Sequence, residues 1–398
     1  MTIEERFCEH CFNSNELIET VRANGVKIDR CLVCGKTHSF ALPANDPLLK
    51  RIFRAVIRLH YSEWEYNDHV GGESLSSILF GENAIMALKE SASAEEFENA
   101  FSYIEDEWYP DADDGISLGG GYWDGHILFG VRARLSSQLT SLLKRSFTDN
   151  YYSLQKDLAN ILEGIRPDIE DNFPKGAELF RARIGVNKRL TSAGNFENYY
   201  SYVAHSESDI GCPPVFAASE GRLNRARVSL LYLASDRKTA VAEIRPHPGH
   251  LVSTAQFKSR QDLKIADLTD KDIRNFLSDS RLDQLQLIFS FNSLMNLPVT
   301  PDRKEYYIIT QLISDSIREA GFDGVKFKSS LGHGDNFTFF NPGDFELIAG
   351  SETVVAVKAL SYQIAKVPTV PKDYDDLEYE VDEDNPLFTL LADLERHR

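Results

Sequence analysis

Hydrophobic and polar positions change their spacing along the chain, and the spacing predicts different elements in different stretches. Between residues 46 and 61, apolar residues recur three and four positions apart after an Asp-Pro start, which predicts an amphipathic helix. Similar patterns at 94–104 and 139–162 favour a mostly helical region over residues 41–172. From residue 177 onward, short apolar runs alternate with helical stretches, which predicts one mixed α/β domain.

The apolar run from Val228 to Ala234 has the length and the β-branched and aromatic content of a buried strand. Asp236 follows as an N-cap, and residues 239–244 are typical of the first turns of a helix. The predicted strand–helix junction carries Tyr232, Glu243 and, just upstream, Arg222. An arginine, a tyrosine and a glutamate together suit an anionic substrate that develops positive charge as it reacts.

Further strands and one clear helix are expected downstream of this junction. The short apolar runs lie at 230–234, 263–265, 325–327, 337–340 and 353–357. The helix covers residues 305–320, and Gly321 directly after it predicts a left-handed C-cap. Beyond residue 363 the chain is acidic and poor in apolar residues, which is typical of a solvated tail.

Composition and charge narrow the class of protein. A chain of 398 residues predicts two or three domains, and its 42% hydrophobic content is enough to build their cores. No apolar run reaches the ~18–20 residues of a membrane span, and the first residues lack the features of a signal peptide, so we expect a cytoplasmic protein. The net charge of −18 disfavours broad binding to nucleic acid but allows a local basic pocket.

Four of the five cysteines lie near the N-terminus with metal-ligand spacing. Cys8 and Cys11 form one pair, and Cys31 and Cys34 form a second pair after nineteen intervening residues. This spacing is close to that of a zinc ribbon, and a module of residues 1–40 would need the metal for stability. Four thiolates leave no open position for catalysis, so the predicted zinc is structural. Two alternatives stay open: His10 or His38 replaces a thiolate, or the thiols are reduced and bind no metal.

Five short motifs follow one another over roughly half of the chain. They are Phe-Arg-x-Arg at 180–183, Gly-Arg-x-Asn at 221–224, Leu-Tyr-Leu-Ala at 231–234, Thr-Ala-x-x-Glu-x-Arg-Pro at 239–246, and Gly-Phe-Asp-Gly at 321–324 with a serine soon after. In this order they resemble the RES domain family, which is named for its Arg, Glu and Ser. The resemblance implies a compact fold like that of the ADP-ribosyltransferases of the diphtheria-toxin class, with NAD as substrate.

The resemblance also assigns roles to single residues. Arg181 would bind the phosphates or ribose, Tyr232 would pack beside the nicotinamide, Glu243 would be the catalytic carboxylate, and Ser329 would fix the cofactor by hydrogen bonding. Arg222 and Asn336 are further matches for cofactor binding, Ser330 is an alternative to Ser329, and Leu223 stands where relatives often have an aromatic residue.

Each of these residues also has an ordinary structural interpretation. Arg181 could pair with a surface carboxylate, Tyr232 could be a core residue, and Ser329 could belong to a turn. Glu243 could form an exposed ion pair with Arg245 or Arg237 on the helix surface, where such pairs contribute little.

The resemblance implies a toxin-type enzyme that breaks the nicotinamide–ribose bond of NAD by hydrolysis or phosphorolysis, and an antitoxin as a possible partner. NAD depletion in a toxin–antitoxin or phage-defence setting would follow. The alternatives are a protein ADP-ribosyltransferase and a non-catalytic module that senses a nucleotide. A ribonuclease is a third hypothesis, because Arg54 and His60 fit the spacing of HEPN ribonucleases, with which helical regions beside RES domains are compared.

The sequence therefore predicts a multidomain protein. The expected parts are a zinc-ribbon-like module at 1–40, a helical HEPN-like domain at 41–172, an α/β RES domain of ADP-ribosyltransferase type at 173–362, and an acidic tail at 363–398.

Overall fold

The structure is a computed structural model of the whole chain. It describes residues 6–60, 73–80, 84–87, 102–108, 117–118, 131–132, 135–146, 148–194, 197–297, 299, 307–361 and 364. Most of the predicted helix at 94–104, almost all of the predicted tail and the side chain of His60 lie outside these residues. None of the described helices has the length and apolarity that crossing a bilayer requires.

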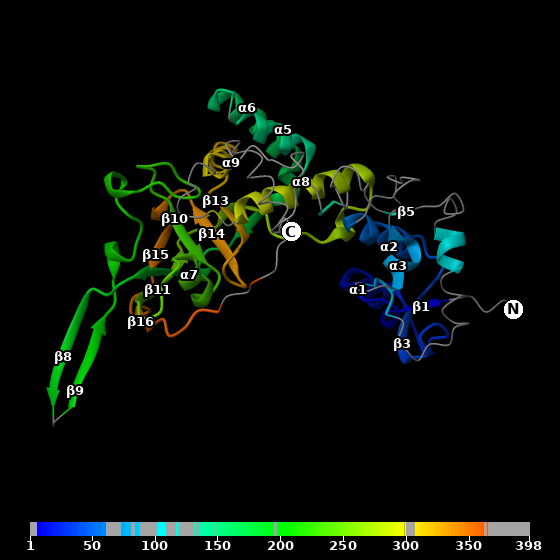
Figure 1. The fold of residues 1–398 in the computed structure, drawn as a ribbon, viewed down its shortest axis with the longest axis horizontal. Coiled ribbons are helices and arrows are strands. Elements are labelled where there is room, and N and C mark those ends of the chain that lie inside the picture. Colours follow the sequence, from blue (N-terminus) through cyan, green and yellow to red (C-terminus); the bar gives the residue numbers. More distant parts are fainter. Residues whose placement is uncertain are drawn as a thin grey trace, which may run out of the picture. The chain divides into compact units, whose positions relative to one another are not determined.

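Contacts divide the chain into two compact units (Figure 1). Unit 1 comprises residues 1–136 and 270–290, and unit 2 comprises residues 137–269 and 291–398. The predicted boundaries at residues 40, 172 and 362 do not coincide with this division. As a description of domains they stay a prediction.

Unit 1 begins with a three-stranded antiparallel sheet in the order β1-β3-β2. Its elements are β1 (Arg6–Cys8), η1 (Glu9–Cys11), α1 (Asn15–Asn24), β2 (Val26–Arg30), β3 (Thr37–Pro43), α2 (Pro47–His60), β4 (Glu73–Ser74), α3 (Leu75–Phe80), the π-helical turn η2 (Ile104–Trp108), β5 (Ser117–Leu118) and η7 (Ile273–Asn275). Helix α8 (Asp279–Asn296) begins in unit 1 and ends in unit 2.

One hydrophobic core joins the cysteine-bearing strands of unit 1 to helix α2. The ring centroid of Phe7 lies 5.5 Å from that of Trp108, and the ring centroid of Phe12 lies 6.4 Å from that of Phe53 on α2. The ring centroids of Phe53 and Trp108 are themselves 4.5 Å apart. The helix predicted from residue 46 is confirmed by α2, whose apolar face enters this core. A mostly helical domain over residues 41–172 is not confirmed. Between α2 and residue 136 the described elements are the short helix α3, the turn η2 and the strands β4 and β5, and the later helices of this range belong to unit 2.

Unit 2 contains a nine-stranded sheet in the order β15-β11-β7-β10-β14-β13-β12-β6, with β16 paired to β11. Its helices are α5 (Ser137–Arg145), α6 (Tyr151–Ile169), α7 (Arg237–Glu243) and α9 (Tyr307–Glu319), with short turns η5 (Glu207–Asp209), η6 (Val215–Ala217) and η9 (Pro342–Asp344). Its strands are β6 (Glu170–Phe173), β7 (Glu178–Ile184), β8 (Lys188–Gly194), β9 (Glu197–Val203), β10 (Leu231–Ala234), β11 (Leu251–Ser259), β12 (Leu263–Asp267), β13 (Gly324–Lys328), β14 (Asp335–Phe339), β15 (Phe345–Leu347) and β16 (Thr353–Ala356).

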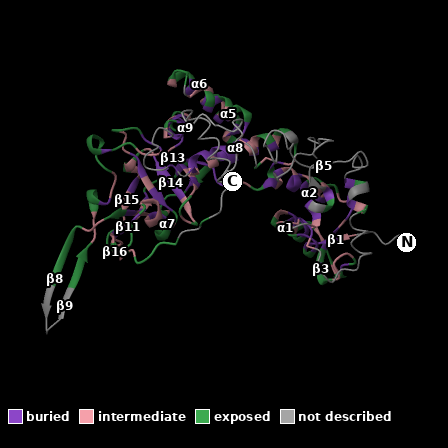
Figure 2. Cartoon of the chain, viewed as in Figure 1, coloured by how far each residue is buried: buried purple, intermediate pink, exposed green. Residues whose placement is uncertain are grey.

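The α/β character predicted for the second part of the chain is confirmed, and the central strands carry its core. Figure 2 shows β13 and β14 largely buried, whereas the described residues of the β8–β9 hairpin are exposed. The predicted strand and helix around residue 236 are β10 and α7, and the Asp236 carboxylate accepts a hydrogen bond from the backbone N–H of Thr239 at 2.9 Å. The predicted helix before Gly321 is α9, and Gly321 adopts a φ of 84°.

The large sheet opens between its strands β7 and β10. Strand β7 pairs with β11 along its whole length, from Glu178 to Ile184. Its pairing with β10 is limited to one position, where Ala234 lies opposite Phe180. Beyond this position the strands separate, so their facing backbone groups become accessible to side chains or a ligand.

Candidate active site

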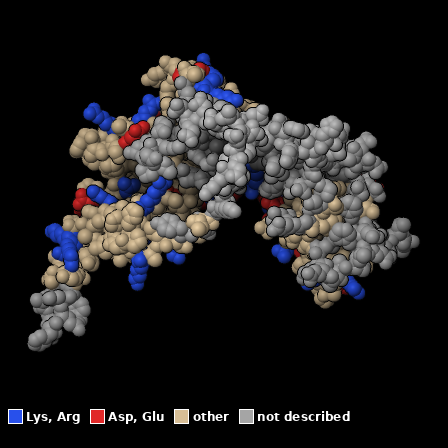
Figure 3. Space-filling view, viewed as in Figure 1, with Lys and Arg blue, Asp and Glu red and all other residues tan. Residues whose placement is uncertain are grey.

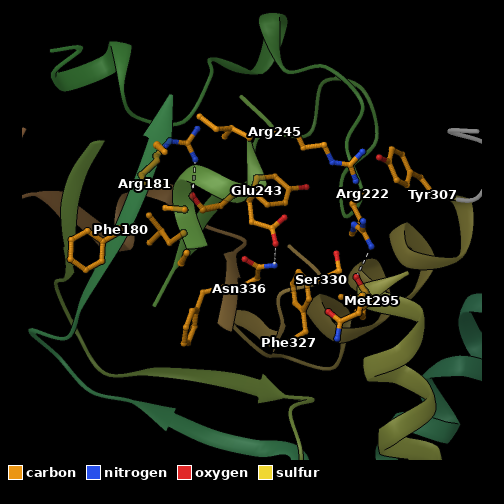
Figure 4. A pocket seen from close by; sticks show the side chains of 18 residues that line it. Phe180, Arg181, Arg222, Glu243, Arg245, Met295, Tyr307, Phe327, Ser330 and Asn336 are labelled. Carbon is orange, nitrogen blue, oxygen red and sulfur yellow. Dashed lines mark hydrogen bonds between the residues drawn. The ribbon is translucent and has the colours of Figure 1, made fainter. Parts of the chain in front are cut away.

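A pocket of about 470 Å³ lies where β7 and β10 separate, a size that is ordinary for small-molecule sites (Figure 4). Its wall is formed by Phe180, Arg181, Ala182, Arg222, Tyr232, Leu233, Ala234, Ala240, Glu243, Ile244, Arg245, Met295, Asn296, Tyr307, Phe327, Ser330, Asn336 and Phe337. The pocket thus gathers residues from β7, β10, α7, the end of α8, β13 and β14. Five of the six predicted catalytic and cofactor-binding residues line it, and the sixth, Ser329, bonds to one of them.

Glu243 stands at the C-terminal end of α7, and hydrogen bonds fix one of its two carboxylate oxygens. Oε1 accepts a hydrogen bond from Ser329 Oγ at 2.5 Å and another from Asn336 Nδ2 at 2.7 Å. Asn336 lies on β14 directly opposite Ala234 of β10, so the sheet register places its amide beneath α7. In the described part of the chain Oε2 has no donor, and this oxygen remains available to a ligand.

The two candidate serines differ in what they contact. Ser329 Oγ donates to Glu243 and accepts hydrogen bonds from the backbone N–H groups of Leu331 at 3.1 Å and Gly332 at 2.8 Å. Gly332 packs so closely that a Cβ atom there would lie 2.7 Å from Thr239 Oγ1 of α7. Ser330 instead lines the pocket. The turn therefore holds Ser329 against the carboxylate and leaves Ser330 facing the cavity.

Three arginines line the same pocket, and each donates to backbone carbonyl oxygens. Arg181 bridges the opening in the sheet, with Nε 2.6 Å from Ile210 O and Nη1 2.8 Å from Tyr232 O. Arg222 Nη1 lies 2.7 Å from Met295 O and 2.6 Å from Leu297 O, and Arg245 Nη1 lies 3.2 Å from Val299 O. None of the three forms an ion pair with a described carboxylate, so the alternative of a surface ion pair does not apply to Arg181 or to Glu243.

Burial acts on the ionisation of these groups. Removal from water lowers the pKa of the guanidinium of Arg181 and that of Arg222. An arginine keeps its charge at neutral pH even with a lowered pKa. The pocket therefore combines three positive charges with the one carboxylate of Glu243, in a chain whose net charge is −18. Figure 3 shows basic side chains scattered over the visible face of the described residues, which contrasts with this gathering of arginines in the pocket.

Tyr232 presents its ring to the pocket while its hydroxyl is held in the loop before β10. The hydroxyl donates to Asn224 Oδ1 at 2.7 Å and accepts the backbone N–H of Leu223 at 3.2 Å. A Cβ atom at Gly221 would lie 2.6 Å from that Asn224 oxygen, so only glycine fits beside this bond. Burial raises the pKa of Tyr232, so the phenol stays neutral and the ring forms a fixed wall.

Several lining residues were not singled out by sequence reasoning. Phe180 and Phe327 add aromatic faces, and Tyr307 and Arg245 add polar ones. The sequence analysis considered Arg245 only as an ion-pair partner for Glu243. Its position two residues after that glutamate could have indicated that it also lines the pocket. Tyr307 begins α9, and nothing in its local sequence connects it with the motifs around Glu243.

The four N-terminal cysteines also come together, in unit 1. Their Sγ atoms all lie within 4.8 Å of one another, and Cys8–Cys34, Cys8–Cys11 and Cys11–Cys31 are 3.3, 3.8 and 3.6 Å apart. Sulfurs at the corners of a tetrahedron with metal–sulfur bonds of about 2.3 Å would lie about 3.8 Å apart. The cluster is built from β1, η1 and the turn after β2, and it could hold a metal ion. His10 and His38 are not among its members.

Residues 201–364 match the family model of the RES domain. The chain contains a RES domain. The matched range includes Arg222, Tyr232, Glu243, Ser329 and Asn336, whereas Arg181 on β7 precedes it. Among solved structures, the chain is similar to the M. tuberculosis MbcT–MbcA toxin–antitoxin complex, with 12% sequence identity and a TM-score of 0.27 over 50% of this chain and 92% of that chain. No curated protein matches the chain.

The predicted HEPN character of the N-terminal region is not shown by these comparisons. Arg54 lies on α2, and the side chain of His60 is outside the described residues. The ribonuclease hypothesis therefore stays a prediction.

Proposed function

We propose that the pocket of the RES domain binds NAD and breaks its nicotinamide–ribose bond. The observation that carries the proposal is the carboxylate of Glu243 in a pocket lined by three arginines. Ser329 and Asn336 hold its Oε1, and no described residue donates to its Oε2. The match to the RES domain supports the same reading.

The chemistry of the bond explains why such a pocket suits it. When the C1′–N bond breaks, the bonding electron pair leaves with nicotinamide, and the ribose develops oxocarbenium character. The fixed carboxylate of Glu243 stabilises that positive charge without moving. In hydrolysis, a water oxygen then bonds to C1′, and the products are nicotinamide, ADP-ribose and one proton.

The remaining pocket residues supply binding. Guanidinium groups pair with phosphate oxygens, and the substrate diphosphate carries two negative charges that the arginines can neutralise. The rings of Phe180, Tyr232 and Phe327 offer flat apolar faces for nicotinamide and ribose. Orthophosphate in place of water would make the reaction a phosphorolysis, and a protein acceptor would make it ADP-ribosylation. Depletion of NAD by a toxin with an antitoxin partner is the setting we propose.

We further propose that Cys8, Cys11, Cys31 and Cys34 hold a structural zinc ion. The four thiolates fill a tetrahedral coordination sphere, and the metal would supply stability rather than catalysis. No step of the reaction in the RES domain requires it.

Release of nicotinamide from NAD by the purified full-length protein tests the catalytic proposal. Glu243→Gln keeps the size of the side chain and its hydrogen bonding but removes the charge, and we expect release to fall by about 10²- to 10³-fold. Glu346→Gln is the matched control, because Glu346 pairs with Lys258 at 2.9 Å outside the pocket. Dependence of release on added phosphate separates phosphorolysis from hydrolysis.

The outcome that overturns the proposal is equal nicotinamide release by wild type and Glu243→Gln. NAD that binds to the zinc-replete wild type and stays intact, with and without phosphate, would instead favour a nucleotide-sensing module.

A further inference from the structure

One end of the pocket gathers Arg222, Arg245 and Tyr307 from three separate segments (Figure 4). Arg222 precedes β10, Arg245 follows α7, and Tyr307 begins α9. Family resemblance assigns a binding role to Arg222 alone, so the other two residues have no assigned function.

The two guanidinium groups keep their outer donors free. Arg222 uses Nη1 for both of its carbonyl contacts, and Arg245 uses Nη1 for its contact with Val299. In each case, within the described residues, the Nε and Nη2 donors have no protein acceptor. This edge of a guanidinium is the one that pairs with two oxygens of a phosphate or carboxylate.

No protein carboxylate among the described residues pairs with these two charges. The Glu243 carboxylate lies nearby, but its Oε1 is already engaged by Ser329 and Asn336. Burial is the main cause of the lowered pKa of Arg222; Tyr307 and Glu243 act to raise this pKa, and the neighbouring charge of Arg245 acts to lower it. Two like charges held near each other, with the carboxylate of Glu243 as the one described acid that acts on Arg222, are stabilised further when an anion binds between them.

The backbone at Arg245 carries a cost that a purely structural residue would not need. Its φ is 48°, in the left-handed region, directly after the C-cap of α7. Glycine is the usual residue at this place because it has no Cβ to clash with the backbone. An arginine there keeps its guanidinium at the pocket at the expense of backbone strain, which is typical of functional positions.

We infer that Arg222, Arg245 and Tyr307 form a subsite for a phosphate group. The free Nε and Nη2 donors of the arginines bind its oxygens, and the hydroxyl of Tyr307 donates a further hydrogen bond. The inference rests on the proposed function for the source of the phosphate, which is either the diphosphate of the dinucleotide or a free orthophosphate that accepts the ribosyl group.

Arg245→Gln tests the subsite, since the one hydrogen bond of the Arg245 side chain to the described residues is long, at 3.2 Å from Val299 O. The probe is ADP-ribose, which carries the diphosphate but no nicotinamide bond to break, and its binding to full-length protein is measured by calorimetry. We expect affinity to fall by about ten- to a hundredfold, the loss of a charge-assisted hydrogen bond. Arg245→Lys keeps the charge without the fork and should retain part of the affinity.

Controls separate charge and folding from binding. Arg189→Gln removes the same charge from β8, where Arg189 stacks on Tyr200 away from the pocket, and should leave ADP-ribose affinity unchanged. Arg245→Gly removes the guanidinium and relieves the left-handed backbone, so it should lose affinity while remaining folded by thermal unfolding.

The outcomes distinguish the two phosphate sources. Weaker ADP-ribose binding in Arg245→Gln assigns the subsite to the diphosphate. Unchanged ADP-ribose binding, with loss of the stimulation of nicotinamide release by orthophosphate, assigns it to the free anion. If Arg245→Gln and Arg245→Gly are folded and change neither quantity, the subsite does not exist.

Failure of the subsite can be told apart from failure of the proposed function. A wild type that binds ADP-ribose through Arg245 but leaves NAD intact would keep the subsite and overturn catalysis. A folded Arg245→Gln protein that matches the wild type in nicotinamide release, in its stimulation by orthophosphate and in ADP-ribose binding would keep catalysis and overturn the subsite.

Discussion

Two regions of the molecule bring chemically identical side chains together, and the two clusters differ in the charge of the ligand that suits them. In unit 1 four thiols converge within 4.8 Å, a geometry that a cation completes. In unit 2 three arginines converge on one pocket without a described ion pair, a geometry that an anion completes. One metal ion could satisfy the four cysteines, and the role proposed for it is to stabilise unit 1. The arginines are hydrogen-bonded to backbone carbonyl oxygens without a ligand, so their remaining N–H donors can bind an anion reversibly.

The largest expected effect is on the thiol cluster. Removal of the metal by a chelator, or Cys31→Ser, should unfold unit 1, because structural zinc binding contributes on the order of 10 kcal/mol to the folding of small modules. Loss of the near-ultraviolet circular dichroism signal, measured together with metal content, checks this.

Cys212→Ser is the control for that experiment. Cys212 lies in unit 2, where its Sγ donates to Leu230 O at 2.8 Å, and its replacement should leave the metal content unchanged. A metal-free protein with the thermal unfolding curve of the wild type would contradict a structural metal.

An intermediate effect is expected for the residues that fix the pocket carboxylate. Ser329→Ala and Asn336→Ala each remove one donor to Glu243 Oε1, and kcat for nicotinamide release should fall by about ten- to a hundredfold with little change in KM. Ser330→Ala is the matched comparison, since Ser330 lines the pocket without bonding to Glu243. Equal losses from the two serine variants would show that the hydrogen bond to Glu243 has no special role.

The smallest expected effect concerns the helix that carries Glu243. Asp236→Ala should lower the free energy of unfolding by about 1 kcal/mol, because it removes the N-cap of α7. Burial alone would raise the pKa of Asp236, but hydrogen bonds from Thr239 and Ser235 outweigh it, and the pKa is lowered. The stabilisation is therefore present above the pKa of the unfolded chain, about 3.9, and is lost as pH falls through the folded value.

Unfolding of wild type and Asp236→Asn across acid pH checks that sign. Asparagine caps the helix without titrating, so the difference between the two proteins should shrink as the pH falls below about 4. A difference that stays constant over this range would mean that the carboxylate charge does not contribute.

Local patterns predicted much of what the two regions contain. Residues whose partners lie near in sequence were found, as with the cysteine pairs, the strand and N-cap around Asp236, and the helix that ends at Gly321. Periodicity shows which face of an element is apolar, but it does not name the element that covers it. For this reason the periodicity of α6 did not indicate that the helix packs against α9 and β12. The sequence predicted α6 in the N-terminal helical domain, whereas its contacts lie in unit 2.

The proposed catalytic residues were selected by the order of the motifs, and their arrangement in space was not predicted. The opening between β7 and β10 depends on pairing between residues 180 and 234, far apart in the chain. Tyr307 reaches the pocket from the start of α9, so no sequence spacing connects it with Arg245. Contacts between residues that are distant in the sequence are determined by the tertiary fold, and local propensity does not predict them.

The discontinuity of unit 1 has a consequence for proteolysis. Residues 270–290 return to this unit, where Arg274 pairs with Glu19 at 3.0 Å and Ser290 Oγ accepts the backbone N–H of Ser136. A protease that cuts the chain once, near residue 136, therefore produces two fragments that remain noncovalently attached under native conditions. A denaturing gel would show the two fragments, whereas size-exclusion chromatography would show one species. Separation of the two units would need two further cuts, around residues 270 and 290.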